Sequence, residues 1–142
     1  MRFNPKAEVG YRVKPAERYL SDAERAFRAG DHRGTVECAQ RAAENAAKAV
    51  IAVNRVPSWS HDPSHELMDA LADLPEEDRE GAKTLAGLAH DLSPEHGRAT
   101  HGEPTRGLTP WELYGRREAE STLSKARTAL ELMKKILRQP PL

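Results

Sequence analysis

The scarcity of strand-forming side chains limits the fold of this chain more than any other feature. Its 142 residues include 21 Ala and 14 Leu, but only 6 Val and 2 Ile. Alanine and leucine favour helices, whereas β-branched side chains favour strands. This balance argues against a mostly β fold, and the length suits one domain built around a single core.

Prolines and apolar periodicity divide the chain into helices. Four prolines stand where an apolar pattern of helical period begins: Pro15, Pro63, Pro75 and Pro110. A proline in the first turn costs a helix nothing, because that nitrogen would have no partner there. The predicted helices span residues 15–29, 32–55, 63–74, 75–92 and 110–138. Joined by short links, they predict an all-α, up-and-down four-helix bundle with an extra short helix, about five helices altogether.

The remaining segments complete the expected domain organisation. We expect residues 1–14 to form an N-terminal extension, residues 15–138 the helical bundle and residues 139–142 a tail. Within the bundle, residues 93–108 read SPEHGRATHGEPTRGL and predict a long polar loop. Loops longer than about 12–15 residues are uncommon in compact domains and are often functional.

The second predicted helix is unusually apolar. Between residues 46 and 53, Lys48 is the only polar side chain. A helix that is apolar nearly all round is buried on more than one side. For a chain this small, a second copy is the simplest cover, so the sequence predicts a homodimer.

Charged residues cancel over the whole chain but are segregated along it. Residues 61–95 carry 2 basic and 10 acidic side chains, a net charge of −8, which the flanking segments offset. The balance gives no global attraction to nucleic acid, and the acidic segment would repel an RNA backbone.

Two observations bear on the compartment. The longest stretch without a charged residue, residues 84–90, is far shorter than the roughly 20 apolar residues of a membrane helix, and no apolar run near the N-terminus suits a signal peptide. The lone Cys38 cannot form an internal disulfide. Both observations predict a cytoplasmic protein with no membrane partner.

Histidines are the candidate chemical groups. His61 and His65 are four residues apart, a spacing that could direct two imidazoles towards one metal. However, the intervening Asp62-Pro63 suggests that His61 precedes the helix and His65 lies inside it. No cysteine or third histidine stands at a ligand-like spacing, so neither a metal nor another cofactor is expected. Surface or capping roles are the alternative.

Arg55 and His61 form an Arg-x5-His pair at the junction of the second and third predicted helices. Arginine can hold two phosphate oxygens at once, and histidine can move a proton to or from a ribose oxygen. This pair could therefore act on a phosphodiester without a metal. Trp59, between the two residues, could stack on a base or could cover the end of the bundle.

Three stretches resemble the HEPN domains, helical bundles shared by prokaryotes and higher eukaryotes. AQRAAENAAKAVI is similar to the family's second-helix pattern A-Q-x-A-x-E-x-A-x-K-A, and His61-Asp62 is similar to its His-Asp pair. The C-terminal PWELYGRREAESTLSKARTALELMKKIL extends the likeness, which covers residues 15–138. The segment GRATHGE also resembles a family segment, with His101 where an aromatic or basic residue is usual.

The resemblance implies a dimer of bundles. Many members are encoded beside a minimal nucleotidyltransferase in toxin–antitoxin or related pairs, and others bind nucleotides. A nucleolytic branch carries Arg-x4–6-His, usually with a polar residue after the arginine. Here Val56 follows Arg55, and no tyrosine follows His61 in the usual place.

These implications give two functions. The first is a dimeric module that binds a nucleotide or a nucleotidyltransferase partner. Its candidate ligand-binding residues are Trp59, His65, Arg98 and His101. The alternative is a metal-independent endoribonuclease that uses Arg55 and His61 on RNA. A purely structural bundle is a third interpretation, and the sequence does not decide whether the chain is an enzyme.

Overall fold

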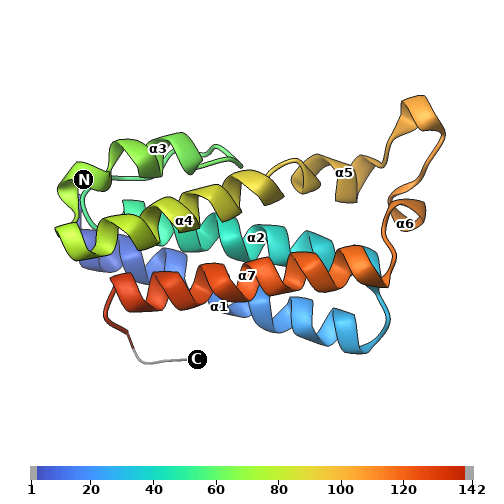
Figure 1. The fold of residues 1–142 in the computed structure, drawn as a ribbon, viewed down its shortest axis with the longest axis horizontal. Helices are drawn as coiled ribbons and strands as arrows, with labels where there is room; N and C mark the ends of the chain where they lie inside the picture. The colour runs from blue at the N-terminus through green and yellow to red at the C-terminus, as the bar shows by residue number, and fades with distance from the viewer. Residues whose placement is uncertain (1–2, 140–142) are drawn as a thin grey trace.

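The chain folds into a bundle of antiparallel helices, as its composition predicts (Figure 1). The computed structural model describes residues 3–139. Its helices are α1 (Pro5–Arg28), α2 (His32–Ile51), α3 (Ser64–Asp69), α4 (Glu76–Leu92), α5 (Glu95–His101), α6 (Pro110–Leu113) and α7 (Arg116–Ile136), with 3-10 turns at Leu71–Asp73 and Pro104–Arg106. The four long helices α1, α2, α4 and α7 form the predicted bundle. Extended pairing within residues 3–139 is limited to one isolated bridge, between Glu103 and Leu108.

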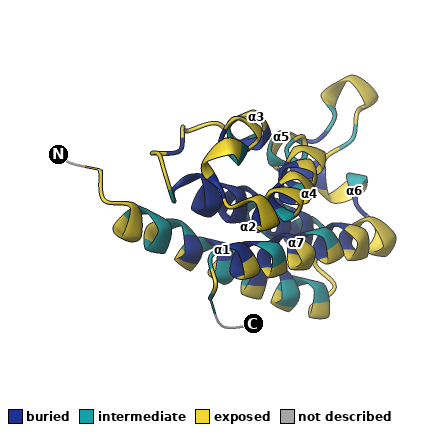
Figure 2. Ribbon diagram, turned by 60° about the vertical axis from the view of Figure 1, so that its left-hand side comes forward, coloured by how far each residue is buried: buried dark blue, intermediate teal, exposed yellow. Residues whose placement is uncertain are grey.

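α2 is the central helix of the bundle. It packs against α1, α7, α4 and α5, and Figure 2 shows it buried along most of its length. Residues 46–52 are all buried, and the alanines among them let neighbouring backbones come close. The chain itself therefore covers the apolar surplus that suggested a second copy. The prediction of a homodimer then depends on the family resemblance alone.

α1 begins ten residues earlier than predicted. The side chain of Asn4 accepts a hydrogen bond from the backbone nitrogen of Ala7 at 3.2 Å, which starts the helix at Pro5. Pro15 therefore lies inside α1 and not at its start. A proline frees the carbonyl one turn earlier, and here that carbonyl belongs to the exposed Tyr11, where water can reach it. Residues 5–14 are thus helix rather than extension, while residues 1–2 lie outside the described part.

The expected polar loop at residues 93–108 is largely helical. It contains α5 and a 3-10 turn, and α5 packs against α2 and α6 through the fully buried Ala99. The prediction of a loop was wrong because α5 has seven residues and one buried alanine, and so lacks the repeating apolar pattern that indicates a helix.

The last predicted helix is divided in two. The backbone is extended at Tyr114, and α7 begins after Gly115, whose nitrogen donates to the Glu118 carboxylate at 3.1 Å. The apolar residues that recur every three or four positions along α7 are at most 2% exposed: Ala119, Leu123, Ala126, Leu130 and Met133. Leu137, the next in that series, caps the end of the helix and is only partly buried. Of the predicted tail, residues 140–142 lie outside the described residues.

The other predicted boundaries shift by a few residues. α2 ends at Ile51 instead of residue 55, and the third predicted helix is α3 followed by a 3-10 turn. Within residues 3–139, every helix falls short of the length and apolar character needed to cross a bilayer.

Candidate functional site

Three polar side chains lie on one buried face of α2. Gln40, Glu44 and Lys48 follow one another at a spacing of four and are only 2%, 9% and 3% exposed. The carboxylate of Glu44 accepts from Gln40 Nε2 on one oxygen and from Lys48 Nζ on the other, both at 3.0 Å. Buried charges are costly unless they are paired and hydrogen-bonded. This face therefore carries a fully engaged carboxylate in the buried part of α2.

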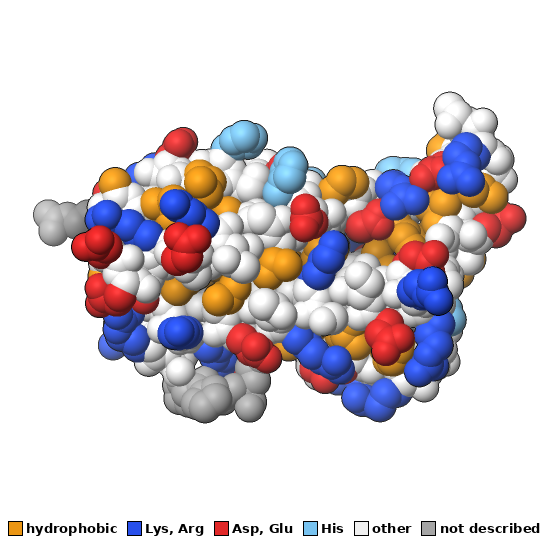
Figure 3. Space-filling view, viewed as in Figure 1, with side chains coloured by type: hydrophobic (Ala, Val, Ile, Leu, Met, Phe, Trp, Pro, Cys, Tyr) orange, Lys and Arg blue, Asp and Glu red, His pale blue; other side chains and the backbone are white. Residues whose placement is uncertain are grey.

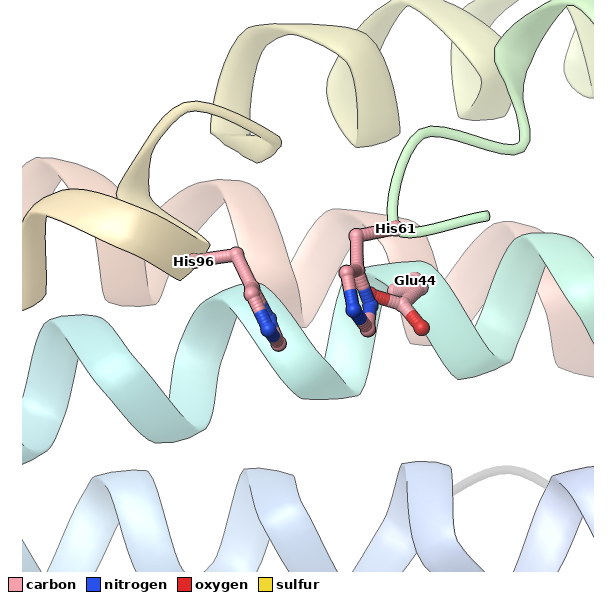
Figure 4. A group of neighbouring side chains, drawn as sticks. All are labelled: Glu44, His61 and His96. Carbon is pink, nitrogen blue, oxygen red and sulfur yellow. The ribbon is translucent and has the colours of Figure 1, made fainter. Parts of the chain in front are cut away.

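Two histidines close over this face from other parts of the chain. His61, before α3, places Nδ1 3.3 Å from Glu44 Oε1, and His96, on α5, places Nδ1 3.2 Å from Gln40 Oε1. Their rings stack with centroids 3.5 Å apart and planes 16° apart. Figure 4 shows both rings side by side over α2. We call Gln40, Glu44, Lys48, His61 and His96 the polar cluster.

The segment that carries His61 is fixed at its next residue. The Asp62 carboxylate accepts a hydrogen bond from the backbone nitrogen of Ser64 at 3.2 Å and contacts His90 Nδ1, on α4, at 2.8 Å. Burial alone would raise the pKa of Asp62, but the hydrogen bonds from Ser64 and His90 outweigh it, so that pKa is lowered. Asp62 thus ties the His61 segment to α3 and α4.

The cluster also changes the protonation of His96. Burial, and then the neighbouring imidazole of His61, lower the pKa of His96 below its ordinary value of 6.5, although Glu44 pulls in the other direction. His96 is therefore held as a neutral imidazole near pH 7. Because Gln40 Oε1 can only accept, the hydrogen lies on His96 Nδ1 and the lone pair on Nε2.

Comparison with known proteins identifies the family. The family model described as the HEPN domain matches residues 9–137, nearly the whole chain. The chain belongs to the HEPN domain family. It is also similar to the crystal structure of TT1696 from Thermus thermophilus, with a TM-score of 0.64 and 25% sequence identity over 90% of this chain and 97% of that one. No curated protein matches the chain.

The stretch that resembled the HEPN second-helix pattern carries the buried face of the cluster. The polar positions of that pattern are Gln40, Glu44 and Lys48. In the His-Asp pair of the resemblance, His61 contacts Glu44 and Asp62 contacts His90. In this HEPN domain the resemblance and the geometry thus point to the same side chains. We therefore treat the polar cluster as the candidate functional site.

Arg55 and His61 have separate partners. Arg55 lies beyond the end of α2 and pairs with Asp73 at 2.7 Å, with both side chains 42% exposed. His61 faces Glu44 and His96 instead. Each of the two residues proposed for phosphodiester chemistry is thus engaged by a different neighbour in this structure.

Trp59 does not cover the end of the bundle. It is 94% exposed, and Val56 on the same segment is 60% exposed. On the face drawn in Figure 3, acidic and basic side chains are interspersed, and histidines gather along the edge over α3 and α4. The segment between α2 and α3 therefore presents an uncovered indole close to the polar cluster in sequence.

The other predicted ligand residues lie apart from the cluster. His65 is exposed on α3 and lines a shallow hollow with Met68 and His90. Arg98, on α5, is held by ion pairs to Glu95 and Glu103. His101 is exposed at the end of α5.

The sequence interpretation missed three groups of the cluster. Gln40 and Glu44 entered the sequence interpretation only through the family pattern. Polar residues four apart lie on one face of a helix, and in an alanine-rich helix this spacing itself indicates a buried polar face. His96 gave no such sign, because the segment around it was predicted as a solvated loop. The sequence argued against a shared site for His61 and His65, and in the structure it is His96, on α5, that stacks on His61.

Proposed function

We propose that this HEPN domain is a nucleotide-binding module, and that the nucleotide docks on residues 52–63, between α2 and α3. The observation that carries the proposal is the exposure of Trp59, 94%, two residues before His61. An aromatic face stacks on a base of any sequence, and such a contact is worth about 1–3 kcal/mol. Val56, 60% exposed, widens the same apolar surface.

His61 supplies a polar contact for the sugar. Its Nδ1 faces a carboxylate, which only accepts, so the hydrogen of the neutral ring lies on Nδ1 and the lone pair on Nε2. That nitrogen can accept a hydrogen bond from a ribose hydroxyl. Glu44 fixes the ring in this orientation, because it is itself held by Gln40 and Lys48.

Arg55 is the nearby cation available to a phosphate. Its pair with Asp73 is well exposed, and exposed ion pairs contribute only about 0–1 kcal/mol. A phosphate group, which accepts two hydrogen bonds from a guanidinium, can therefore compete with Asp73 for Arg55. Base, sugar and phosphate would then each have a contact on one segment.

Titration calorimetry with adenosine and guanosine 5′-monophosphates tests this proposal. We expect saturable binding by the full chain and a loss of about tenfold or more in affinity for Trp59→Ala, from the lost stacking. Trp111→Ala is the matched control, since Trp111 is 71% exposed but lies on α6. Absence of binding at millimolar nucleotide, or equal affinities for wild type and Trp59→Ala, would contradict the proposal.

The family resemblance indicates which partners such a module would have. We infer a cytoplasmic homodimer that works with a minimal nucleotidyltransferase in a toxin–antitoxin-like pair, the nucleotide being the ligand the two proteins share. Co-purification of a nucleotidyltransferase encoded beside this chain is the direct test of the partner.

A metal-independent endoribonuclease is the second candidate, and the pairing of His61 with Glu44 favours it. A histidine oriented by a buried carboxylate is suited to general acid–base chemistry. Against it stand the ion pair of Arg55 with Asp73, the apolar Val56 and the acidic segment that follows. We expect the wild type to leave single-stranded RNA intact in the presence of a chelator. Cleavage that is lost in His61→Ala would make the nuclease the better proposal.

A further inference from the structure

Three potential metal ligands meet in the polar cluster, each from a different element. One donor atom from each of Glu44, His61 and His96 lies within 4.8 Å of the other two. In this structure His61 Nδ1 donates to Glu44 Oε1 across 3.3 Å. Ligand atoms around a tetrahedral zinc ion lie about 3.4 Å apart, given bonds of roughly 2.1 Å. An ion that replaces this hydrogen bond therefore needs little change in the spacing of the two atoms, and the ring hydrogen of His61 then lies on Nε2.

The rings of the two histidines are stacked. The centroids of His61 and His96 are 3.5 Å apart with nearly parallel planes. Because the lone pair of an imidazole nitrogen lies in the plane of its ring, one ring must turn out of the stack for both to bind the same ion. The side chain of His61 is 56% exposed, which leaves its ring free to turn.

The neighbours of the three ligands resemble a metal site's outer shell. Histidines that bind metals usually donate the hydrogen of their other ring nitrogen to an oxygen, which fixes the free lone pair. Gln40 Oε1 plays this part for His96 Nδ1 at 3.2 Å. Gln40 Nε2 in turn donates to Glu44 Oε1 at 3.0 Å, so one side chain positions two of the three ligands.

Lys48 limits how tightly a cation can bind. Its ammonium group lies 3.0 Å from Glu44 Oε2 and already neutralises the carboxylate. Oε1 remains on the side of the histidines. The extra positive charge lowers the affinity for a divalent ion, so binding should be reversible rather than the permanent kind that a structural zinc site shows.

We propose that Glu44, His61 and His96 bind a divalent transition-metal ion of the zinc class. Imidazole nitrogens favour Zn²⁺, Co²⁺, Ni²⁺ and Cu²⁺ over Mg²⁺ and Ca²⁺, which take oxygen ligands. Three protein ligands leave a fourth position for water or an exchangeable ligand atom. This site goes beyond the nucleotide proposal and does not depend on it. The histidine spacing in the sequence did not predict it, because His96 is distant from His61 along the chain.

Calorimetric titration of ZnCl₂ into the untagged, chelator-treated full chain at pH 7.5 tests the site. We expect one ion per chain, and a loss of more than about tenfold in affinity for both His61→Gln and His96→Gln. His61 is exposed and His96 is partly exposed, and glutamine keeps their polar character, so these variants should fold. His65→Gln is the matched control, because His65 is only four residues from His61 but outside the cluster.

Cobalt gives an independent readout. Co²⁺ bound through nitrogen and oxygen ligands in a four-coordinate site should give intense visible absorption, which His96→Gln should abolish. Trp59→Ala should bind zinc like the wild type, which separates this site from the nucleotide proposal. The metal site is refuted if the wild type binds no zinc, or if His96→Gln binds it as tightly as the wild type.

Discussion

Glu44 is the residue on which the candidate site is built. It accepts hydrogen bonds from Gln40 and Lys48, which are buried, and contacts the exposed His61. Replacing a buried ion pair by apolar side chains is often neutral or stabilising. Stability alone therefore does not explain why α2 has a glutamate and a lysine at buried positions. This is an argument that Glu44 serves binding.

His96 should make the stability of the protein depend on pH. Its pKa is lowered in the folded state, first by burial and then by His61 and Arg41, against the pull of Glu44 and Glu37. The unfolded chain therefore binds a proton more readily than the folded one as pH falls below about 6.5. The stabilisation is complete above that pH and is lost towards the folded pKa.

Urea unfolding at pH 7.5, 6.5 and 5.5 measures this effect. We expect the free energy of unfolding to fall with pH in the wild type, and to fall less in His96→Gln, which has no proton to gain. Comparing the two slopes removes the contributions of the other titrating groups. Equal slopes would show that the surroundings of His96 do not disfavour its charged form.

At the scale of the element, long periodic helices could be predicted from the sequence and short ones could not. α2, α4 and α7 follow from apolar stripes that repeat over several turns. α5 has a single buried alanine, and α6 has only four residues, so neither shows an apolar stripe that repeats. The sequence predicts a helix that starts at Pro15, whereas the N-cap Asn4 and the first-turn Pro5 start α1 ten residues earlier.

The same limit explains what could be predicted of the site. His61 was singled out from its neighbours in the sequence, and the pattern that holds Glu44 was recognised as a family signature. Their partner His96 sits on α5, the short helix that the periodicity could not reveal. The cluster is thus a product of tertiary packing: α2 supplies the carboxylate, the segment before α3 supplies His61, and α5 supplies His96.

At the scale of the whole molecule, the central position of α2 decides how the chain can associate. Within one chain, Ala46, Ala47 and Ala49 are fully buried and Val50 is 1% exposed. Among residues 3–139, the exposed large apolar side chains are few: Phe3, Tyr11, Val56, Trp59, Met68 and Trp111. Obligate dimers usually bury a large apolar face that the monomer cannot cover. In this protein one chain alone buries the apolar core, so we expect a dimer of it to be non-obligate.

We therefore expect a homodimer that dissociates without unfolding. Light scattering at micromolar concentration should give the mass of two chains, and dilution should give one chain with unchanged helical circular dichroism. Association of folded chains stabilises them by mass action, so the melting temperature rises with concentration over the range in which the dimer forms. Once dilution has given single chains, a further tenfold dilution should leave it unchanged, because the core shown in Figure 2 is complete in a single chain. A mass of one chain at every concentration would contradict the predicted dimer. Loss of helical circular dichroism as the mass falls to that of one chain would mean that the second copy completes the fold.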